Sequence, residues 1–380
     1  MSGSPRPSLR VRILGYGLMI LAPLALAALL EGVGLVYLKS RGEPTHRPFV
    51  RRGAIQEAKG LFDTRDSFSY LDPHLSHAHN PASLTRLGLK HIPGFAIFGA
   101  AEDPEAATVV ALGGSTTDPV AGTSWPEFLA ERLARDGYSV RVLNGGVAGY
   151  SSNQELLKLI RDVLPLKPAL ILSLNGVNDL GFLHSAPAHP MVHPYQKRIL
   201  SAVAGAGTNA PLLMPNAVSA AIDLFSGPPE IGINLGTEAD PRDYEQWFAN
   251  VRMMHAVSAE FGIPYVCFLQ PILGVGDYEA SAEEEAMLEK TATQHAPARD
   301  YKAEMVHFYT GARDEAKRAP YVVDLVDVFA GEAGMYNDAR HQTAAGRKHL
   351  ADAVFQHCLR LGVLDGVRRN LGSPPPPGAP

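Results

Sequence analysis

The sequence predicts an α/β fold, a three-layer α/β/α sandwich with a mostly parallel central sheet, preceded by one N-terminal transmembrane helix. From about residue 105 onward, short apolar runs typical of buried strands alternate with amphipathic segments typical of helices. This alternation indicates a parallel sheet that helices cover on both faces. Near the N-terminus, a continuous apolar run over residues 13–37 indicates the membrane helix.

The apolar run over residues 13–37 contains Glu31 as its only charged residue and exceeds the roughly 20 residues that span a bilayer. Arginines within residues 1–12 precede it, as in a signal or signal-anchor segment. The small residues Ala25 and Ala27 offer a cleavage site, but the run stays apolar for about ten residues beyond them. We therefore expect a retained anchor, with a cleaved signal as the alternative.

The orientation of this helix rests on opposing signals. Residues 39–52 contain five Lys or Arg residues, more than the three arginines that precede the helix, and this count argues against a cytoplasmic N-terminus. The short N-terminus and the export-like layout favour a cytoplasmic N-terminus. We expect a single-pass protein of the cell inner membrane whose main domain is periplasmic.

The chain divides into five expected regions. A short basic N-terminus and the transmembrane segment come first, followed by a Pro- and His-rich stalk and lead-in segment. The main domain comes next, with an insertion that is either a lid or an unstructured segment, and a Pro-rich disordered tail ends the chain. The boundaries are 1–12, 13–37, 38–100, 101–365 and 366–380, with the insertion at 181–240.

The expected elements of the main domain follow one another along the chain. Strands are expected at 107–112, 138–144, 169–175, 263–270 and 321–329. Helices are expected at 124–137, 151–164, 243–262, 299–318 and 343–362. Ser124 is expected to cap the first of these helices, and Ser152 with Glu155 is expected to form a capping box at the second.

Three strand ends carry the residues that point to chemistry. The strands at 107–112, 138–144 and 169–175 lead, in order, to Ser115, Gly149 and Asn178. Because the carboxyl ends of parallel strands share one edge of the sheet, where ligands bind in open α/β sheets, we expect these residues to converge. Asp179 follows Asn178 and is expected either to bind polar groups of a substrate or to cap backbone groups.

Asp338 and His341 lie three residues apart, after the last expected strand. Together with Ser115 they supply what nucleophilic acyl transfer requires: a hydroxyl, a base that takes its proton and a carboxylate that orients the base. The backbone N–H groups of Ser115 and Gly149 and the side-chain amide of Asn178 are candidate oxyanion donors. The structural alternatives are a helix-capping role for Ser115 or Asp338 and an ordinary surface position for His341.

Histidines and cysteines outside these motifs are not expected to hold a metal. Two groups of histidines are His184, His189 and His193 in the insertion, and His74, His77 and His79 before the main domain. The first group fits no known zinc spacing, and the second is expected to be solvated. The two cysteines, Cys267 and Cys358, are expected to be small buried hydrophobes. We therefore expect no metal and no cofactor.

The blocks GGST (113–116), GGVAGY (145–150), GVND (176–179) and DARH (338–341) resemble, in order and context, the signature blocks of the SGNH hydrolases, also called GDSL-type esterases and lipases. The resemblance covers roughly residues 105–360. It implies a flavodoxin-like sandwich. It also implies that Ser115 is the nucleophile, that His341 is the general base and that Asp338 orients this base. Gly149 and Asn178 complete the oxyanion hole on this resemblance.

One block departs from the family pattern. Gly114 stands where the family has Asp, a residue outside the catalytic set. This Gly-Gly-Ser form is similar to that of membrane-anchored bacterial members, as are the segments SYLDPHLSHAHNP (69–81) and FLQPIL (268–273). On this resemblance, Gln270 is a further candidate for contacting the substrate.

Composition and resemblance together define the expected function. The net charge of −5 and the absence of basic blocks argue against a nucleic-acid partner. We expect a serine esterase, with an O-acetyl or acyl ester of a cell-envelope or exported carbohydrate as substrate, because of the expected location. The alternatives are a lipase or thioesterase on acyl chains, a glycan O-acetyltransferase and a non-catalytic glycan-binding envelope protein. Dinucleotide binding is disfavoured, because the glycines lack the G-x-G-x-x-G spacing.

Overall fold

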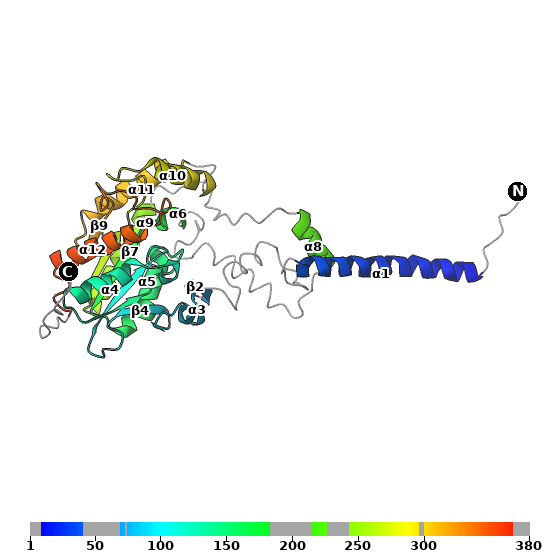
Figure 1. Cartoon of the computed structure of the whole chain (residues 1–380), viewed down its shortest axis with the longest axis horizontal. Helices are drawn as coiled ribbons and strands as arrows, with labels where there is room; N and C mark the ends of the chain where they lie inside the picture. The colour runs from blue at the N-terminus through cyan, green and yellow to red at the C-terminus, as the bar shows by residue number, and fades with distance from the viewer. Residues whose placement is uncertain are drawn as a thin grey trace, which may run out of the picture. The chain divides into compact units, whose positions relative to one another are not determined.

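A computed structural model describes residues 9–40, 69–72, 74–182, 215–225, 243–295 and 300–367. These residues fall into two compact units (Figure 1). One unit, within residues 1–58 and 200–231, contains helices α1 (Leu9–Ser40) and α8 (Asn216–Phe225). The other unit, within residues 59–199 and 232–380, contains the sheets and the other described helices.

The main sheet has seven strands in the order β3-β4-β6-β5-β7-β8-β9. Five strands are parallel to one another: β5 (Ala107–Gly113), β6 (Val140–Asn144), β7 (Leu170–Asn175), β8 (Tyr265–Leu269) and β9 (Val322–Asp324). The strands β3 (His91–Ile92) and β4 (Phe95–Gly99) add an antiparallel edge beside β6. Numbered along the chain, the parallel strands follow the 2-1-3-4-5 order of flavodoxin-like sheets, which confirms the predicted mostly parallel sheet.

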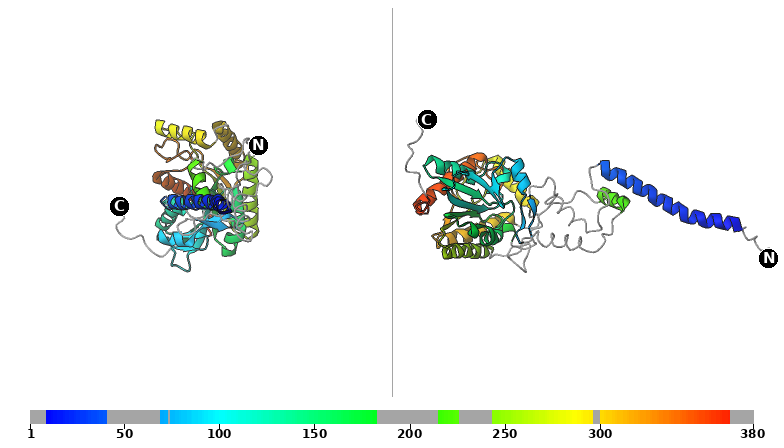
Figure 2. Two further views of the ribbon diagram at one scale, coloured as in Figure 1. Left: turned by 90° about the vertical axis from the view of Figure 1, so that its right-hand side faces the viewer. Right: turned by 90° about the horizontal axis from the view of Figure 1, so that it is seen from below.

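Helices cover both faces of this sheet, which confirms the predicted three layers (Figure 2). On β8, the Tyr265 hydroxyl lies 3.7 Å from the sulfur of Met254 on one face. The Phe268 ring on the other face lies 6.4 Å from the ring of His357. The two outer layers contain α4 (Trp125–Arg135) and α12 (Ala344–Arg360) on the Phe268 face, and α5 (Ser152–Lys158), α9 (Asp243–Glu260) and α11 (Tyr301–Ala316) on the Tyr265 face. The unit also contains α3 (Pro81–Arg86), α6 (Asp179–Phe182) and α10 (Ala282–His295).

The ends of α4 and α12 lie close to where sequence signals place them. Helix α4 begins directly after its N-cap, Ser124, and ends two residues before Gly137. Helix α12 begins after Thr343, whose hydroxyl oxygen accepts a hydrogen bond from the Gly346 N–H at 3.2 Å. Asp338 is therefore not the N-cap of this helix.

The capping box of α5 lies one residue earlier than predicted. Ser151 is the N-cap, and its backbone N–H and hydroxyl both donate to Oε1 of Gln154, at 3.2 and 2.8 Å. The predicted partners have other contacts: Ser152 donates to Asp179, and Glu155 is fully buried. Tertiary contacts of Ser152 and Glu155 thus shift the box from the position that local pattern indicated.

The segment before residue 101 contributes more structure than a stalk. A hairpin of β1 (Ser69–Asp72) and β2 (Ser76–His79) precedes β3 and β4, and β4 pairs with β6, so the main sheet begins before the expected boundary. His77 and His79 are buried, with 3% and 2% of their surfaces exposed, so the expectation that they are solvated is wrong. The cause is packing of the hairpin, through Leu75, against the loop that follows β6.

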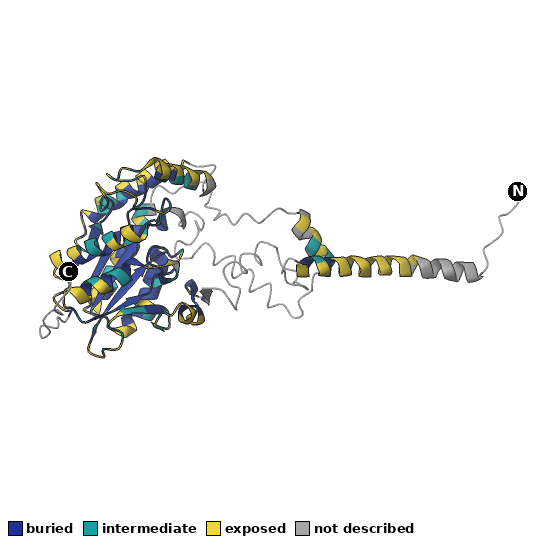
Figure 3. Cartoon of the chain, viewed as in Figure 1, coloured by how far each residue is buried: buried dark blue, intermediate teal, exposed yellow. Residues whose placement is uncertain are grey.

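Helix α1 extends beyond both ends of the predicted 13–37 segment. Most of its described large apolar side chains are exposed to the surroundings (Figure 3), including Leu21, Leu24, Leu29, Val33 and Val36, whereas Leu38 is buried. Its stretch Leu21–Ser40 is the single span, within the described residues, that is long and apolar enough to cross a membrane, although a signal sequence has the same character.

Helix α8, within the expected insertion at 181–240, belongs to the same unit as α1. Oε1 of Glu31 accepts hydrogen bonds from the backbone and side-chain nitrogens of Asn216, each at 2.8 Å, and Oε2 accepts one from Ala217 N at 3.0 Å. A Cβ on Gly34 would lie 2.4 Å from that same nitrogen, so the two helices approach closely. The first turn of α8 thus satisfies the carboxylate of the apolar span.

A buried polar network lies between β7 and the helices of the Tyr265 face. Oε2 of Glu155 accepts hydrogen bonds from Ser173 Oγ at 3.0 Å and from Asn175 Nδ2 at 2.9 Å. Oε1 of Glu155 has no partner. Burial is the main cause that raises the pKa of Glu155, to about 8. The side chain is therefore an uncharged carboxylic acid at neutral pH. Cys267 on β8 and Cys358 on α12 are also buried, as predicted, and both are free thiols.

The substitution Glu155→Gln is expected to change how stability depends on pH. Folded wild-type protein keeps its proton on Glu155 up to about pH 8, whereas the unfolded chain releases it near the ordinary glutamate pKa of 4.5. Between these values the unfolded state binds fewer protons, so the free energy of unfolding falls by about 1.4 kcal/mol per pH unit from this group. The Gln side chain does not ionise, so the free energy of unfolding of the variant lacks this decrease. The stability of the variant relative to wild type therefore increases as the pH rises.

Thermal unfolding of the full-length protein in detergent, followed by tryptophan fluorescence, measures this effect, because both tryptophans, Trp125 and Trp247, lie in the sheet unit. The unfolding temperatures of variant and wild type are compared at about pH 5 and about pH 8. Glu131→Gln, at an exposed position on α4, is the control. An equal difference at both pH values contradicts the assignment of a neutral Glu155.

Candidate active site

The three loops that carry the predicted site residues leave the sheet at one edge. Strand β5 lies between β6 and β7 and is parallel to both. The loop after β5 holds Ser115, the loop after β6 holds Gly149, and the loop after β7 holds Asn178. The order of the parallel strands reverses direction at β5, and in doubly wound sheets such a switch point is where ligands bind.

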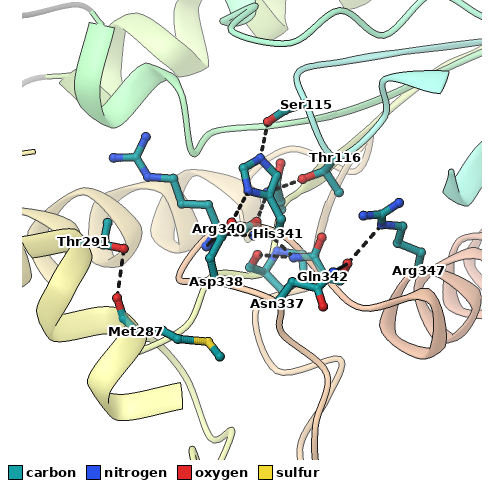
Figure 4. A network of polar contacts seen from close by, with 12 residues as sticks. Ser115, Thr116, Met287, Thr291, Asn337, Asp338, Arg340, His341, Gln342 and Arg347 are labelled. Atoms are coloured by element: carbon teal, nitrogen blue, oxygen red, sulfur yellow. Dashed lines mark hydrogen bonds and ion pairs between the residues drawn. The ribbon is translucent and has the colours of Figure 1, made fainter. Parts of the chain in front are cut away.

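Ser115, His341 and Asp338 form a continuous chain of hydrogen bonds (Figure 4). The distance from Ser115 Oγ to His341 Nε2 is 2.6 Å, and the distance from His341 Nδ1 to Asp338 Oδ2 is 2.8 Å. A carboxylate only accepts, so Nδ1 carries the ring proton and Nε2 accepts the Ser115 hydroxyl hydrogen. The hydroxyl of Ser115 is thus engaged with a base, and the N-cap of the next helical turn, at residues 119–121, is Asp118.

The charge of Asp338 is well supported by its hydrogen bonds. Burial by itself raises the pKa of this carboxyl, but hydrogen bonding and charge interaction with the His341 ring oppose that effect. The other oxygen, Oδ1, accepts from the backbone N–H groups of Arg340 and His341, at 2.8 and 3.0 Å. Together these contacts lower the pKa of Asp338 to about 2. The group that orients the imidazole therefore stays ionised at neutral pH.

A closed loop holds Asp338 and His341 at their short spacing. The Asn337 N–H donates to the carbonyl of His341 at 2.8 Å, and a β-bridge joins Tyr336 to Gln342. The loop is also tied to the segment after β8, because Leu273 N donates to the carbonyl of Ala339 at 3.1 Å. The hydrogen bond from Leu273 holds the loop at the sheet edge.

Gln270 connects the loop of Ser115 to the loop of His341. Its Nε2 donates to Thr116 Oγ1 at 2.9 Å and to the Arg340 carbonyl at 3.1 Å. The side chain is 1% exposed. Sequence reasoning treated Gln270 as a substrate contact and missed this bridging position, because no local pattern relates residues that lie 154 and 70 positions apart.

Asn178 lies against the turn that carries Ser115. Its Nδ2 donates to the carbonyl of Tyr150 at 2.7 Å, and the residue is 8% exposed. A Cβ at Gly114 would lie 2.5 Å from this nitrogen, so the observed approach depends on glycine at that position. The Gly114 that departs from the family motif is therefore fitted to the placement of Asn178.

The other predicted residues have well-defined surroundings. Gly149 has a φ of 83°, a left-handed conformation that glycine adopts without steric cost. Asp179 is fully buried and accepts hydrogen bonds from the backbone N–H of Ser152, at 3.1 Å, and from its hydroxyl. Its observed contacts are thus those of a backbone cap at the start of α5.

Among the described residues, no group of three or more His, Cys, Asp or Glu side chains is arranged to hold a metal ion. The histidines at 184, 189 and 193 lie outside the described part of the chain.

The arrangement combines the parts needed for acyl transfer. A hydroxyl lies within hydrogen-bond distance of an imidazole nitrogen, and an ionised carboxylate holds the other nitrogen. Ser115, Gly149 and Asn178, the candidate oxyanion donors, stand on adjacent loops of the same edge.

Comparison with known proteins addresses the family. Residues 111–285 match the model of the GDSL-like lipase/acylhydrolase family. That range contains the first three motif blocks, while DARH at 338–341 lies beyond it. No curated protein sequence matches the chain significantly.

Solved structures with detectable likeness include a mutant of an acetyl-xylooligosaccharide esterase from Geobacillus, which is 14% identical with a TM-score of 0.39 over 66% of this chain and 93% of that one. A lipase/acylhydrolase from Enterococcus faecalis is 14% identical with a TM-score of 0.37 over 66% of this chain and 95% of that one. Residues 111–285 of this chain therefore carry a GDSL-like lipase/acylhydrolase domain.

Proposed function

We propose that this domain hydrolyses carboxylic esters through an acyl-enzyme formed on Ser115. The observation that carries the proposal is the hydrogen-bonded chain from Ser115 Oγ through His341 to Asp338, with distances of 2.6 and 2.8 Å. In this chain the imidazole is placed to take the hydroxyl proton, and Asp338 is placed to stabilise the imidazolium that forms.

The reaction proceeds in two halves. Ser115 Oγ attacks the ester carbonyl carbon while its proton passes to His341 Nε2, which gives a tetrahedral intermediate with a negatively charged oxygen. The intermediate collapses, the bond to the alcohol oxygen breaks, and the imidazolium donates its proton to the leaving alcohol. In the second half a water molecule loses a proton to Nε2 and attacks the acyl carbon. The second tetrahedral intermediate collapses, the bond to Ser115 Oγ breaks as the imidazolium returns its proton to that oxygen, and the acid is released.

The oxyanion requires donors that are fixed before the reaction. We assign this role to the backbone N–H groups of Ser115 and Gly149 and to Nδ2 of Asn178. One hydrogen of Nδ2 is donated to Tyr150 O, and the second is the one assigned to the oxyanion. Loss of one such donor typically costs about 3 kcal/mol of transition-state stabilisation.

The substrate class follows from the proposed location. A retained α1 holds the domain at the inner membrane, on its periplasmic side, where ester-bearing carbohydrates of the envelope or of export pathways are the available substrates. The proposed reaction is removal of O-acetyl or other acyl groups from such a glycan. Glu31 supports a spanning role for α1, because the carboxylate inside the apolar stretch is satisfied by three N–H donors of α8.

Ester hydrolysis by wild-type and Ser115→Ala protein tests the proposed reaction. The full-length protein is assayed in detergent with p-nitrophenyl acetate and with a long-chain p-nitrophenyl ester. Turnover is expected to fall by several orders of magnitude in Ser115→Ala, because the nucleophile is removed. Thr310→Ala, which removes an exposed hydroxyl on α11, is the control and is expected to keep wild-type turnover.

The outcomes separate the candidate activities. Ser115-dependent release with a preference for acetate supports the glycan esterase, and a preference for the long chain supports a lipase or thioesterase instead. Release of acetyl groups only when a sugar acceptor is present indicates a transferase. No Ser115-dependent release from any of these donors favours the non-catalytic glycan-binding protein and contradicts the proposed hydrolysis.

Membrane retention has a separate test. A retained anchor is expected to keep the protein in the membrane pellet after alkaline carbonate extraction, and the intact mass of that protein is expected to include residues 1–27. A protein in the soluble fraction whose mass lacks these residues shows cleavage after Ala27 and contradicts the anchor.

A further inference from the structure

We infer that His77, in the hairpin before the main sheet, is a positioning residue of the active site: it fixes the peptide unit between Ala148 and Gly149, and thereby the direction of the Gly149 N–H. The inference rests on the proposed function, in which this N–H binds the oxyanion. His77 lies outside the four motif blocks, and its role follows from its contacts.

The imidazole of His77 is oriented at both of its nitrogens. Nε2 lies 2.8 Å from the carbonyl oxygen of Ala148, and Nδ1 lies 2.8 Å from Ser76 Oγ. A carbonyl oxygen only accepts, so Nε2 carries the hydrogen that is donated to Ala148. Burial is the main cause that lowers the pKa of His77, so the ring is neutral and its Nδ1 accepts the hydroxyl hydrogen of Ser76.

The hydrogen bond to Ala148 acts on the oxyanion donor through the geometry of the peptide group. The carbonyl of Ala148 and the N–H of Gly149 belong to one planar unit, and no cis peptide bond occurs among the described residues. In a trans unit the C=O and N–H point in opposite directions. A donor that fixes the carbonyl on one side therefore fixes the direction of the N–H on the other side.

A hydrogen bond from the Ala148 N–H holds the preceding peptide unit, between Val147 and Ala148, and so limits movement of Ala148 from that side. The Ala148 N–H donates to Asp118 Oδ2 at 2.7 Å. Asp118 Oδ1 is in turn 3.1 Å from His79 Nε2, and both of these side chains are buried. The N–H and the C=O of Ala148 are thus both hydrogen-bonded. His77 of strand β2 contacts the C=O directly, and His79 of the same strand contacts Asp118, which accepts from the N–H.

The same hairpin also supports Asn178, another proposed oxyanion donor, through Tyr150. The Tyr150 hydroxyl donates to the backbone carbonyl of His77, and the two rings meet edge to face with centroids 5.3 Å apart. The backbone carbonyl of Tyr150 accepts from Asn178 Nδ2. The hairpin therefore contacts the loop residues on both sides of Gly149, and the loop in turn holds Asn178.

The conformation of Ser76 indicates that this arrangement is specified by its surroundings. Ser76 has a φ of 71°, a left-handed conformation that non-glycine residues adopt infrequently. Such conformations persist where neighbouring contacts determine them. The hydrogen bond between Ser76 Oγ and His77 is one of those contacts, and it holds the imidazole plane.

Two substitutions at His77 test the inference in the full-length protein. His77→Phe keeps the ring volume and the edge contact with Tyr150 but removes the donor to Ala148. It is expected to lower kcat on p-nitrophenyl acetate by about 10- to 100-fold, with KM changed by less than about twofold, because the donor acts on the transition state. His77→Gln retains an N–H donor and is expected to recover most of that loss. His74→Phe, at an exposed position in the same hairpin, is the control and is expected to match wild type.

A second readout does not depend on catalysis. Hydrogen exchange measured by mass spectrometry on peptides covering residues 145–151 is expected to be faster in His77→Phe than in wild type or His74→Phe. Exchange in peptides of β7 and β8 is expected to stay unchanged. This readout reports on the loop even when no ester is hydrolysed, so a failure of the proposed function is distinguishable from a failure of this inference.

Two results overturn the inference. One is unchanged exchange in the 145–151 peptides of His77→Phe, alone or together with a wild-type kcat. The other is a loss of kcat in His77→Phe that His77→Gln shows in full, with the unfolding temperature lowered equally in both variants. That pattern describes a buried histidine that is needed for folding alone. Selective loss of kcat with recovery in His77→Gln supports it.

Discussion

The parallel pairing of β5 with both β6 and β7 is the constraint on which the rest of the site depends. Val109 of β5 pairs with Val142 on one side and with Leu170 on the other, and these residues are almost completely buried. Because the three strands run in the same direction, their loops leave the sheet at one edge, and residues far apart in the chain meet there. The His341 loop then needs only its own ties to the segment after β8 to complete the chain of hydrogen bonds.

Buried side chains that donate to backbone carbonyls hold these loops relative to one another. Asn178 donates to Tyr150, Gln270 donates to Arg340, and His77 donates to Ala148. Each of these contacts joins two loops or elements that are separate in the sequence. An unpaired buried carbonyl or amide is costly, so these contacts favour one arrangement of the site before any substrate binds. The order of the site therefore depends on the residues around Ser115, His341 and Asp338 as well as on these three residues.

Apolar alternation is a local signal, so the layers and the parallel strands could be predicted from the sequence. Short motifs pointed to Ser115, His341 and Asp338, and the structure brings these three side chains into one chain of hydrogen bonds. Long-range contacts account for the errors. Ser152 donates to Asp179 and Glu155 is buried in the core, so the capping box is formed by Ser151 and Gln154 instead. The burial of His77 arises from packing against a loop 71 residues away. Local sequence signals also do not indicate the antiparallel edge formed by β3 and β4 or the grouping of α8 with α1. Both depend on contacts between residues that lie far apart in the sequence.

We propose that Ser115 is an activated nucleophile, because its hydroxyl is hydrogen-bonded to an imidazole that a carboxylate orients. Reaction of the full-length protein with a fluorophosphonate, followed by peptide mass spectrometry, measures this directly. One phosphonyl adduct is expected in folded protein, on the peptide that contains Ser115, and none is expected after heat denaturation. Absence of an adduct on Ser115 in the folded protein, or labelling of several serines at the same rate, would contradict it.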